Sequence, residues 1–307
     1  MAVRVAVIGV GHLGQHHARI YAELPDVELV AVADTSEPRR EEIGGRLGVP
    51  AVADYRSLLG AVDAVSVAVP TFAHHDVALA FLEAGCDVLV EKPITETVAH
   101  ADALVEAAAR RGRILQVGHS ERYNGAVQVL SDYVQSPGFI EVHRMGPFPG
   151  RGTDVDVVLD LMIHDIDIVL TLVKSPVISV SAVGVPVVSD LVDIANARIE
   201  FASGCVANIT ASRVTGERVR RIRVFQRDTY FVLDYATQEL SLYRQTNGEG
   251  PGTGHLIRIE VPVARVEPLR QELSDFVESV RTRRPPMVSG EAGRDAVAVA
   301  AEIISRI

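Results

Sequence analysis

The N-terminal segment that ends at Asp34 constrains the fold more than any other part of the chain. Residues 4–8 form a β-branched run that leads into Gly9-Val10-Gly11-His12-Leu13-Gly14, and residues 15–24 have the composition of a helix. Glycines at these spacings allow a tight turn, and the free N–H groups of a helix N-terminus can bind a pyrophosphate. The next predicted strand, residues 27–33, ends at Asp34, twenty residues after Gly14, where a carboxylate can bind a ribose 2′-hydroxyl. This combination predicts a dinucleotide site.

The acid at the end of the second strand favours NAD over NADP, because Asp34 would repel a 2′-phosphate. Arg39 and Arg40 follow closely and could serve such a phosphate, although a solvated helix face is the simpler interpretation. The cofactor-binding residues predicted from this segment are Gly9, Gly11, His12, Leu13, Gly14 and Asp34.

Strands and helices alternate as far as residue 118. Strands are predicted at 4–8, 27–33, 51–52, 64–69, 87–91 and 114–118, with helices at 15–24, 38–47, 76–84 and 98–110. This alternation is typical of a doubly wound parallel sheet, in which ligands bind beyond the carboxyl ends of the strands. The residues expected there are Pro70, Thr71, His74, Glu91, Lys92 and His119.

Glu91-Lys92-Pro93 places a charged pair and a proline after an apolar strand, at the edge where a nicotinamide should bind. An ammonium in that position can polarise a substrate oxygen, and the alternative is a strand-ending turn with a surface ion pair. The chain has two lysines, Lys92 and Lys174. A lysine can lose its proton readily, whereas an arginine cannot.

The pattern changes after residue 120. A linking helix is predicted at 121–135, a strand at 139–145 and a buried helix at 157–173. Strands without intervening helices follow at 177–187, 192–201, 205–212, 219–226, 230–234 and 256–262, and helices at 269–281 and 291–304 end the chain. Short turns between strands imply antiparallel pairing. We therefore predict a Rossmann domain at 1–120 and an α+β domain at 121–307 built on an open, mostly antiparallel sheet, with the last helices able to pack back on the first domain.

Asp160 and His164 are the polar residues of interest in the buried helix. Their spacing of four would put both side chains on one face, so that the carboxylate could orient and polarise the imidazole. A satisfied structural pair is the alternative.

Composition limits the possible functions. The chain has 307 residues, 48% of them hydrophobic, and a formal charge of −10, which argues against a nucleic-acid partner. Two distant cysteines make no disulfide framework, and no apolar run reaches the length of a membrane span. We expect a cytoplasmic protein without a metal site, because no group of His, Cys and Asp residues has metal-binding spacing.

With Gly9-x-Gly11-x-x-Gly14, Glu91-Lys92-Pro93 and Asp160-x-x-x-His164 in this order, the chain resembles the Gfo/Idh/MocA family along nearly its whole length. The resemblance implies an NAD-dependent dehydrogenase of sugars or inositols. It carries the family's catalytic lysine, aspartate and histidine onto Lys92, Asp160 and His164.

A narrower resemblance, through Gly118–Asn124 and Leu161–Asp167, points to the branch that contains UDP-N-acetylglucosamine 3-dehydrogenases. This branch usually has proline where Gly125 stands, which leaves the local backbone open. The resemblance implies oxidation of C3 of a UDP-N-acetylhexosamine. The candidate substrate-binding residues are His119, Arg122, Tyr123, Asn124, Arg144, Arg151, Asp160 and His164.

Under this hypothesis NAD accepts a hydride while His164 takes the hydroxyl proton, Asp160 stabilises the charged imidazole and Lys92 binds the same oxygen. Lys92 could itself take the proton. A dehydrogenase of a free sugar or inositol is one alternative, and a non-catalytic protein that senses sugar or NAD is another. An open antiparallel sheet needs covering, so we expect a homo-oligomer, either a dimer or a tetramer.

Overall fold

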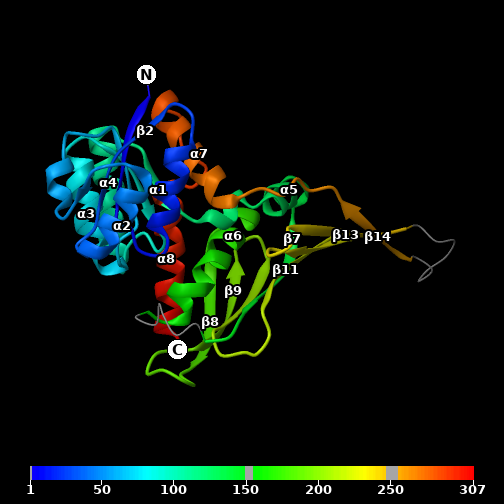
Figure 1. The fold of residues 1–307 in the computed structure, drawn as a ribbon. Helices are drawn as coiled ribbons and strands as arrows, with labels where there is room; N and C mark the ends of the chain where they lie inside the picture. Colours follow the sequence, from blue (N-terminus) through cyan, green and yellow to red (C-terminus); the bar gives the residue numbers. More distant parts are fainter. Residues whose placement is uncertain (1, 149–154, 247–254) are drawn as a thin grey trace. The chain divides into compact units, whose positions relative to one another are not determined.

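The structure is a computed structural model that describes residues 2–148, 155–246 and 255–307 (Figure 1). The chain forms two compact units. The N-terminal unit contains residues 1–120 and 268–297, and the C-terminal unit contains residues 121–267 and 298–307. Helix α7 (Pro268–Thr282), counted with the second domain in the sequence prediction, thus lies in the N-terminal unit, and helix α8 (Gly290–Ser305) contributes to both.

The N-terminal unit is built on a six-stranded sheet in the order β3-β2-β1-β4-β5-β6. Every neighbouring pair in this sheet is parallel. Its strands are β1 (Val3–Ile8), β2 (Val27–Ala33), β3 (Ala51–Val52), β4 (Ala64–Val67), β5 (Asp87–Glu91) and β6 (Leu115–Gly118). Its helices, besides α7, are α1 (Gly14–Glu23), α2 (Glu37–Leu47), α3 (His74–Glu83) and α4 (Val98–Arg111), with 3₁₀ turns η1 (Tyr55–Leu58) and η2 (Thr71–Ala73). The predicted doubly wound sheet is confirmed, and its order reverses between β1 and β4, where such folds bind ligands.

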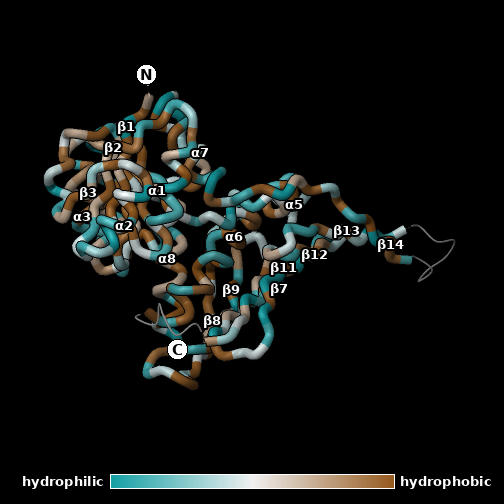
Figure 2. Tube along the Cα trace, viewed as in Figure 1, coloured by the Kyte–Doolittle hydropathy of each residue, from teal (hydrophilic) through white to brown (hydrophobic). Residues whose placement is uncertain are grey.

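The core of this unit follows from its apolar strands. All residues of β4 and β5 are buried, as expected for parallel strands that are covered on both faces. Figure 2 shows hydrophobic residues, in brown, concentrated around the strands labelled β1 and β2 of the same sheet. Ile20 of α1 and Phe276 of α7, both fully buried, belong to the same cluster as Val5 and Val7 of β1. Helix α7 is therefore part of the core of the N-terminal unit.

The C-terminal unit is built on an eight-stranded sheet in the order β14-β13-β12-β11-β7-β10-β9-β8. One neighbouring pair, β10 with β7, is parallel and the others are antiparallel. The strands are β7 (Pro137–Met145), β8 (Val177–Val185), β9 (Ile194–Phe201), β10 (Val206–Ser212), β11 (Val219–Gln226), β12 (Thr229–Asp234), β13 (Glu239–Gln245) and β14 (Leu256–Val261). The mostly antiparallel α+β architecture is confirmed.

Strand β13 is absent from the sequence prediction. It buries Leu240 and Leu242 on one face and follows a turn in which Gln238 has a φ of 53°. Because neither glycine nor proline marks this turn, the local sequence gives no signal that a new strand begins. Pairing with β12 and β14, rather than β-propensity, defines the strand.

The predicted linking helix at 121–135 is two elements. A 3₁₀ turn, η3 (Ser120–Tyr123), ends at Asn124, and α5 (Gly125–Tyr133) begins there. The Asn124 side-chain oxygen accepts a hydrogen bond from the Ala126 backbone N–H at 3.0 Å, so Asn124 is the N-cap of α5. A Cβ on Gly125 would lie 2.3 Å from the backbone oxygen of Ala264, so the backbone is too close here for a side chain.

No helix among the described residues is both long enough and apolar enough to cross a membrane.

Candidate active site

The glycine turn after β1 has the geometry that a dinucleotide needs. Gly9 has a φ of +84°, and a Cβ there would lie 2.7 Å from the backbone oxygen of Ala68. A Cβ on Gly14 would lie 1.8 Å from the backbone oxygen of Gly9, so the start of α1 packs directly on the turn. A Cβ on Gly11 would meet nothing within 4 Å. Gly9 and Gly14 are therefore required by packing, and Gly11 leaves open space where a ligand can approach the backbone, as NAD binding requires.

Asp34 lies against this turn, as the sequence predicts. Its Oδ2 accepts a hydrogen bond from the Val10 backbone N–H at 2.9 Å, and its Oδ1 accepts one from the Ser36 N–H at 2.8 Å. Arg39 donates to the backbone oxygens of Val10 and Gly11 at 3.2 and 3.4 Å and forms an ion pair with Glu42. Arg39 thus braces the glycine turn, an alternative that sequence reasoning did not consider.

The segments after β4 and β5 are joined through His74. The ring Nδ1 lies 2.8 Å from the Pro93 backbone oxygen, and Nε2 lies 2.9 Å from the Val69 oxygen. Burial lowers the pKa of His74, although the carbonyl oxygens oppose that shift. Pro70 and Thr71, at the start of η2, lie beside this junction in the sequence, and the Lys92–Pro93 peptide bond is cis. His74 therefore links two predicted cofactor-binding segments, and both contacts are hydrogen bonds only when the ring is protonated, because a carbonyl oxygen accepts and a neutral imidazole has a single N–H.

Glu91 is buried, and its partner is a residue that sequence reasoning dismissed. The Nε2 atom of His17 in α1 lies 2.9 Å from Glu91 Oε1, and the ring Nδ1 lies 3.1 Å from the Ser66 hydroxyl. Although burial raises the pKa of Glu91, the His17 hydrogen bond and the charges of His17 and Lys92 hold it below its usual value. Glu91 is therefore a carboxylate in the electrostatic field of Lys92. The pair joins residues 74 positions apart, so no local motif could have revealed it.

The predicted regular α-helix at 157–173 is wrong in its first turns. Residues Val158–Met162 form a π-helical turn, η4, before α6 (Ile163–Val173). The Ile163 backbone N–H donates to the Val158 oxygen, the five-residue spacing of a π-helix. Asp160 lies in the π turn and His164 lies in α6, and both side chains are partly exposed. Because single π turns inside helices recur at functional sites, this irregularity agrees with a functional role for the pair.

The polar residues around η3 make contacts within the C-terminal unit. Tyr123 and Asn124 are both 1% exposed, and the Asn124 side-chain nitrogen donates to the Tyr235 backbone oxygen at 3.0 Å. Arg122 donates hydrogen bonds to Asp167 Oδ1, at 3.3 Å, and to Thr171 Oγ1. These contacts support η3 and α5, so a substrate role for these three residues stays a prediction.

Arg144 is buried in a network of carboxylates. Its Nε and one terminal nitrogen donate to both oxygens of Asp165 at 2.7 and 3.0 Å, and its other terminal nitrogen donates to Glu121 at 3.1 Å. Its guanidinium also lies over the Tyr235 ring. Although burial opposes it, the charges of Asp165 and Glu121 raise the pKa of Arg144 above its usual value. No local pattern indicates these partners, and they make a stabilising role the simplest account of Arg144.

The structure gives fewer contacts for the two remaining substrate-binding candidates, His119 and Arg151. His119 is 1% exposed and follows β6, where its backbone N–H donates to the Val117 oxygen at 2.8 Å. Arg151 lies outside the described residues.

Asp167 gives a pH-dependent prediction for stability. Burial raises the pKa of Asp167 to about 7, although the charge of Arg122 opposes the rise. The folded protein therefore keeps a proton that the unfolded chain releases near pH 4, and wild-type stability falls as the pH rises through that window by about 1.4 kcal/mol per unit. Asp167→Asn should remove this slope. Thermal melts of both proteins from about pH 5 to 7 measure it, and parallel curves would contradict a neutral Asp167.

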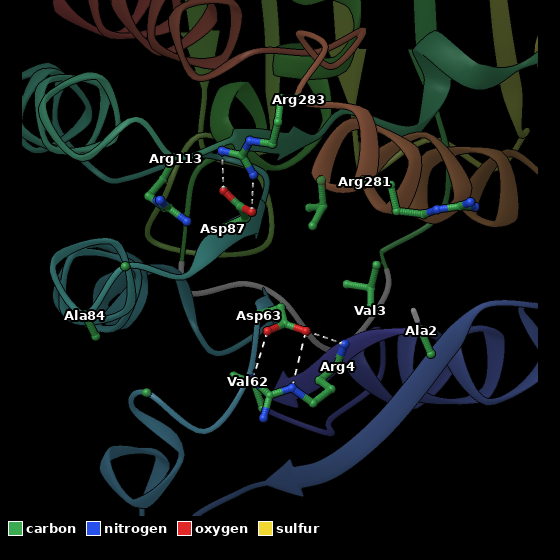
Figure 3. Close-up of a pocket in the computed structure, with 13 residues that line it drawn as sticks. Ala2, Val3, Arg4, Val62, Asp63, Ala84, Asp87, Arg113, Arg281 and Arg283 are labelled. Atoms are coloured by element: carbon green, nitrogen blue, oxygen red, sulfur yellow. Dashed lines mark hydrogen bonds and ion pairs between the residues drawn. The ribbon is translucent and has the colours of Figure 1, made fainter.

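A cavity of about 600 Å³ lies at the opposite edge of the parallel sheet, at the amino ends of β1 and β5 (Figure 3). Ion pairs of Arg4 with Asp63 and of Arg283 with Asp87 line it. None of the predicted site residues is among those that line it.

Comparisons with known proteins agree with this geometry. Residues 3–119 match the family model described as "Oxidoreductase family, NAD-binding Rossmann fold", and residues 144–230 match the "GFO/IDH/MocA C-terminal domain". The chain is 38% identical over 302 residues to UDP-N-acetylglucosamine 3-dehydrogenase of Acidithiobacillus ferrooxidans, covering 98% of this chain and 96% of that protein.

A solved structure and a further dehydrogenase are also similar to this chain. A solved structure of the A. ferrooxidans enzyme matches with a TM-score of 0.95 and 37% identity, covering 100% of this chain and 98% of that chain. The scyllo-inositol 2-dehydrogenase (NAD(+)) of Bacillus subtilis is 28% identical over 314 residues, covering 94% of this chain and 89% of that protein. The chain belongs to the Gfo/Idh/MocA family and is an NAD-dependent oxidoreductase with an N-terminal Rossmann fold.

Proposed function

We propose that this enzyme oxidises the C3 hydroxyl of a UDP-N-acetylhexosamine to a ketone. The observation that carries the proposal is the 38% identity to a UDP-N-acetylglucosamine 3-dehydrogenase over 98% of the chain. The intact set of Lys92, Asp160 and His164 supports turnover rather than sensing, because a sensor needs no proton acceptor.

The proposed chemistry assigns one role to each catalytic side chain. NAD, when bound, accepts the hydride from the ring carbon. His164 takes the hydroxyl proton, since an imidazole titrates near neutral pH. Asp160, in the π turn that precedes α6, stabilises the charged ring. Lys92 donates a hydrogen bond to the same oxygen and stabilises its developing negative charge.

The residues proposed to hold NAD are those of the glycine turn together with Asp34. Gly11 leaves open space above the backbone, and the α1 N-terminus after Leu13 offers N–H groups to the pyrophosphate. His12, Pro70 and Thr71 complete the proposed contacts, and the buried His74 and Glu91 support the segments that make them.

Oxidation of a free sugar or an inositol is the second candidate, supported by the 28% identity to the inositol dehydrogenase of B. subtilis. NADH absorbance on mixing the protein with NAD and a panel of UDP-sugars, hexoses and inositols separates the two. We expect turnover with UDP-N-acetylglucosamine. Preference for inositol would move the assignment to the second candidate, and tight NAD binding without reduction at high protein concentration would favour a sensor.

Replacing Asp34 by Ala should weaken NAD binding about ten-fold, the effect of one lost hydrogen bond to a ribose hydroxyl. NADP binding should weaken less or improve, because the repulsive carboxylate is gone. Titration of each dinucleotide measures both affinities. Asp63→Ala is the matched control, since Asp63 also accepts a backbone N–H at 2.9 Å, from Arg4, but lines the cavity at the amino ends of the strands. Equal losses for NAD and NADP would contradict the role of Asp34.

We further propose a cytoplasmic homo-oligomer, a dimer or a tetramer. The cytoplasmic location is supported by the dependence on NAD, which the cytoplasm supplies. Apolar side chains on both edge strands of the eight-stranded sheet support assembly. On β8, Ile178 and Val183 are 66% and 59% exposed, and on β14 Leu256 is 60% exposed. Light scattering after size-exclusion chromatography measures the mass, and a monomer would contradict assembly.

A further inference from the structure

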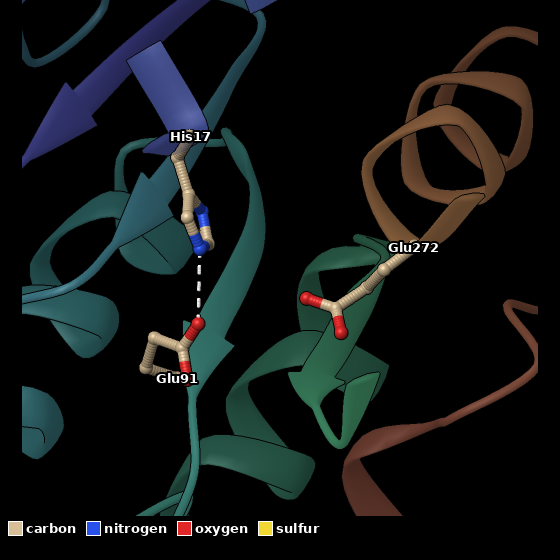
Figure 4. Close-up of side chains that lie close together, drawn as sticks. All are labelled: His17, Glu91 and Glu272. Carbon is tan, nitrogen blue, oxygen red and sulfur yellow. Dashed lines mark hydrogen bonds and ion pairs between the residues drawn. The ribbon is translucent and has the colours of Figure 1, made fainter. Parts of the chain in front are cut away.

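Three titratable side chains meet inside the N-terminal unit, next in sequence to Lys92. His17 of α1, Glu91 of β5 and Glu272 of α7 each bring one ligand-type atom to within 4.8 Å of the others. They are 0%, 7% and 0% exposed. Figure 4 shows the Glu272 side chain extending from its helix toward Glu91 and His17. Such a cluster needs a physical account, because buried charges are costly unless they are paired.

Two members of the cluster, His17 and Glu91, have hydrogen-bond partners for all their side-chain nitrogen and oxygen atoms. Because the Glu91 carboxylate can only accept, His17 Nε2 donates to its Oε1 at 2.9 Å, and the backbone N–H of Lys92 donates to its Oε2 at 3.2 Å. The other ring nitrogen of His17 contacts the Ser66 hydroxyl, which lies 3.0 Å from the Tyr21 hydroxyl. A chain of hydrogen bonds thus runs from Tyr21 to the backbone of Lys92.

Glu272 is different. Neither of its carboxyl oxygens has a hydrogen-bond partner among the residues that the structure describes. Burial, followed by the negative charges of Glu91 and Asp275, raises the pKa of Glu272 well above its usual value. Two carboxylates this close cannot both ionise in a water-free interior, so one of them keeps its proton. His17 and Lys92 favour the charged form of Glu91, which leaves the proton on Glu272.

We propose that Glu272 is a positioning residue: a neutral carboxylic acid that places no second negative charge beside Glu91 and so preserves the His17–Glu91 pair next to Lys92. The charged or titratable groups that face it are Glu91, His17, Tyr21 and, on its own helix, Asp275. The proton fixes the cluster at one net charge, so that the field of Glu91 at Lys92 stays constant over the working pH range. The effect on catalysis rests on the proposed function of Lys92, whereas the protonation of Glu272 does not.

A divalent cation is the competing explanation, because one imidazole and two carboxylates also suit a transition metal. The 2.9 Å hydrogen bond already occupies the ring nitrogen that such a metal would need. Metal analysis of the purified protein decides between the two. About one equivalent of metal that is retained on dialysis and lost in Glu272→Gln would overturn the proposal.

Infrared difference spectroscopy tests the proton directly and needs no substrate. In the Asp167→Asn background, which removes the other protonated carboxyl group, we expect the C=O band of a protonated carboxylic acid at neutral pH, absent when Glu272→Gln is added and retained when Glu91→Gln is added. A band that is lost in Glu91→Gln instead, or no band at all, overturns the proposal. The infrared band reports the protonation of Glu272 whether or not the proposed substrate is correct.

Kinetics test the positioning role. Glu272→Met, which keeps the size but removes the polar group beside Glu91, should lower kcat about ten-fold with little change in the KM for NAD, and Glu272→Gln should restore most of the loss, because its amide is a neutral polar group of the same shape. Removing the Glu91 charge in Glu91→Gln should shift the basic limb of the kcat pH profile by about one unit, while Glu272→Gln leaves it in place. An equal shift in both variants would show that Glu272 is ionised.

Discussion

Replacing Lys92 by Ala should slow hydride transfer about 100- to 1,000-fold, the usual cost of removing one donor to a developing oxyanion. Single-turnover reduction of NAD by the proposed sugar nucleotide isolates this step. The affinity for NAD should change only slightly, because the glycine turn and Asp34 remain. A loss in binding equal to the loss in rate would mean that Lys92 holds the ligand rather than stabilising the reacting oxygen.

Two variants make the Lys92 result interpretable. Lys92→Arg keeps the charge but cannot give up a proton, so a large residual rate in Lys92→Arg would favour charge stabilisation over proton transfer. Lys174→Asn is the matched control, because Lys174 is the other lysine of the chain, is exposed and has a φ of 49° that asparagine tolerates. Unchanged hydride transfer in Lys92→Ala would remove the residue from the mechanism.

The parts of the site that the sequence predicts are those whose physics is local. The positions of Gly9 and Gly14 follow from the steric needs of one turn, and the structure shows contacts at both that exclude a Cβ. The position of Asp34 at the end of β2 follows from the length of that strand and from its parallel pairing with β1. The Gly14 contact is with Gly9 of the same turn, whereas the Gly9 contact is with Ala68, which follows β4, so the structure adds a distant reason for a glycine that the local turn already requires.

The parts that the sequence does not predict depend on distant partners. His17 looks like half of an ordinary histidine pair until β5 brings Glu91 to 2.9 Å from its ring. Arg144 looks like a phosphate ligand until α6 supplies Asp165. Burial changes what such a side chain can do, and burial is a property of the packed unit. The pattern within one segment therefore identifies polar residues of interest without separating substrate contacts from internal ion pairs.

The π turn at Val158–Met162 is the most informative of these differences for function. An apolar run with helical periodicity predicts a regular α-helix, because a π turn carries no compositional signal. The turn adds one residue to the helical repeat between Val158 and Ile163, which changes the direction of Asp160 relative to a regular helix. Single π turns of this kind recur at functional sites. The functional role of Asp160 stays a prediction, and the π turn is a second reason, besides its spacing from His164, to test it.

Replacing His164 by Ala should lower kcat about 100- to 10,000-fold, the usual contribution of a positioned general base. The pH profile should change as well, because the acidic limb of kcat/KM reports protonation of the base and disappears when the base is removed. Asp160→Asn should keep that limb with a smaller loss of rate, since the amide can still orient the ring but cannot stabilise its charge. His143→Ala is the matched control, because His143 is a partly exposed histidine on β7 of the same unit. If His164→Ala retained both its rate and its acidic limb, Lys92 would have to be the proton acceptor, and the two residues would exchange roles in the proposed mechanism.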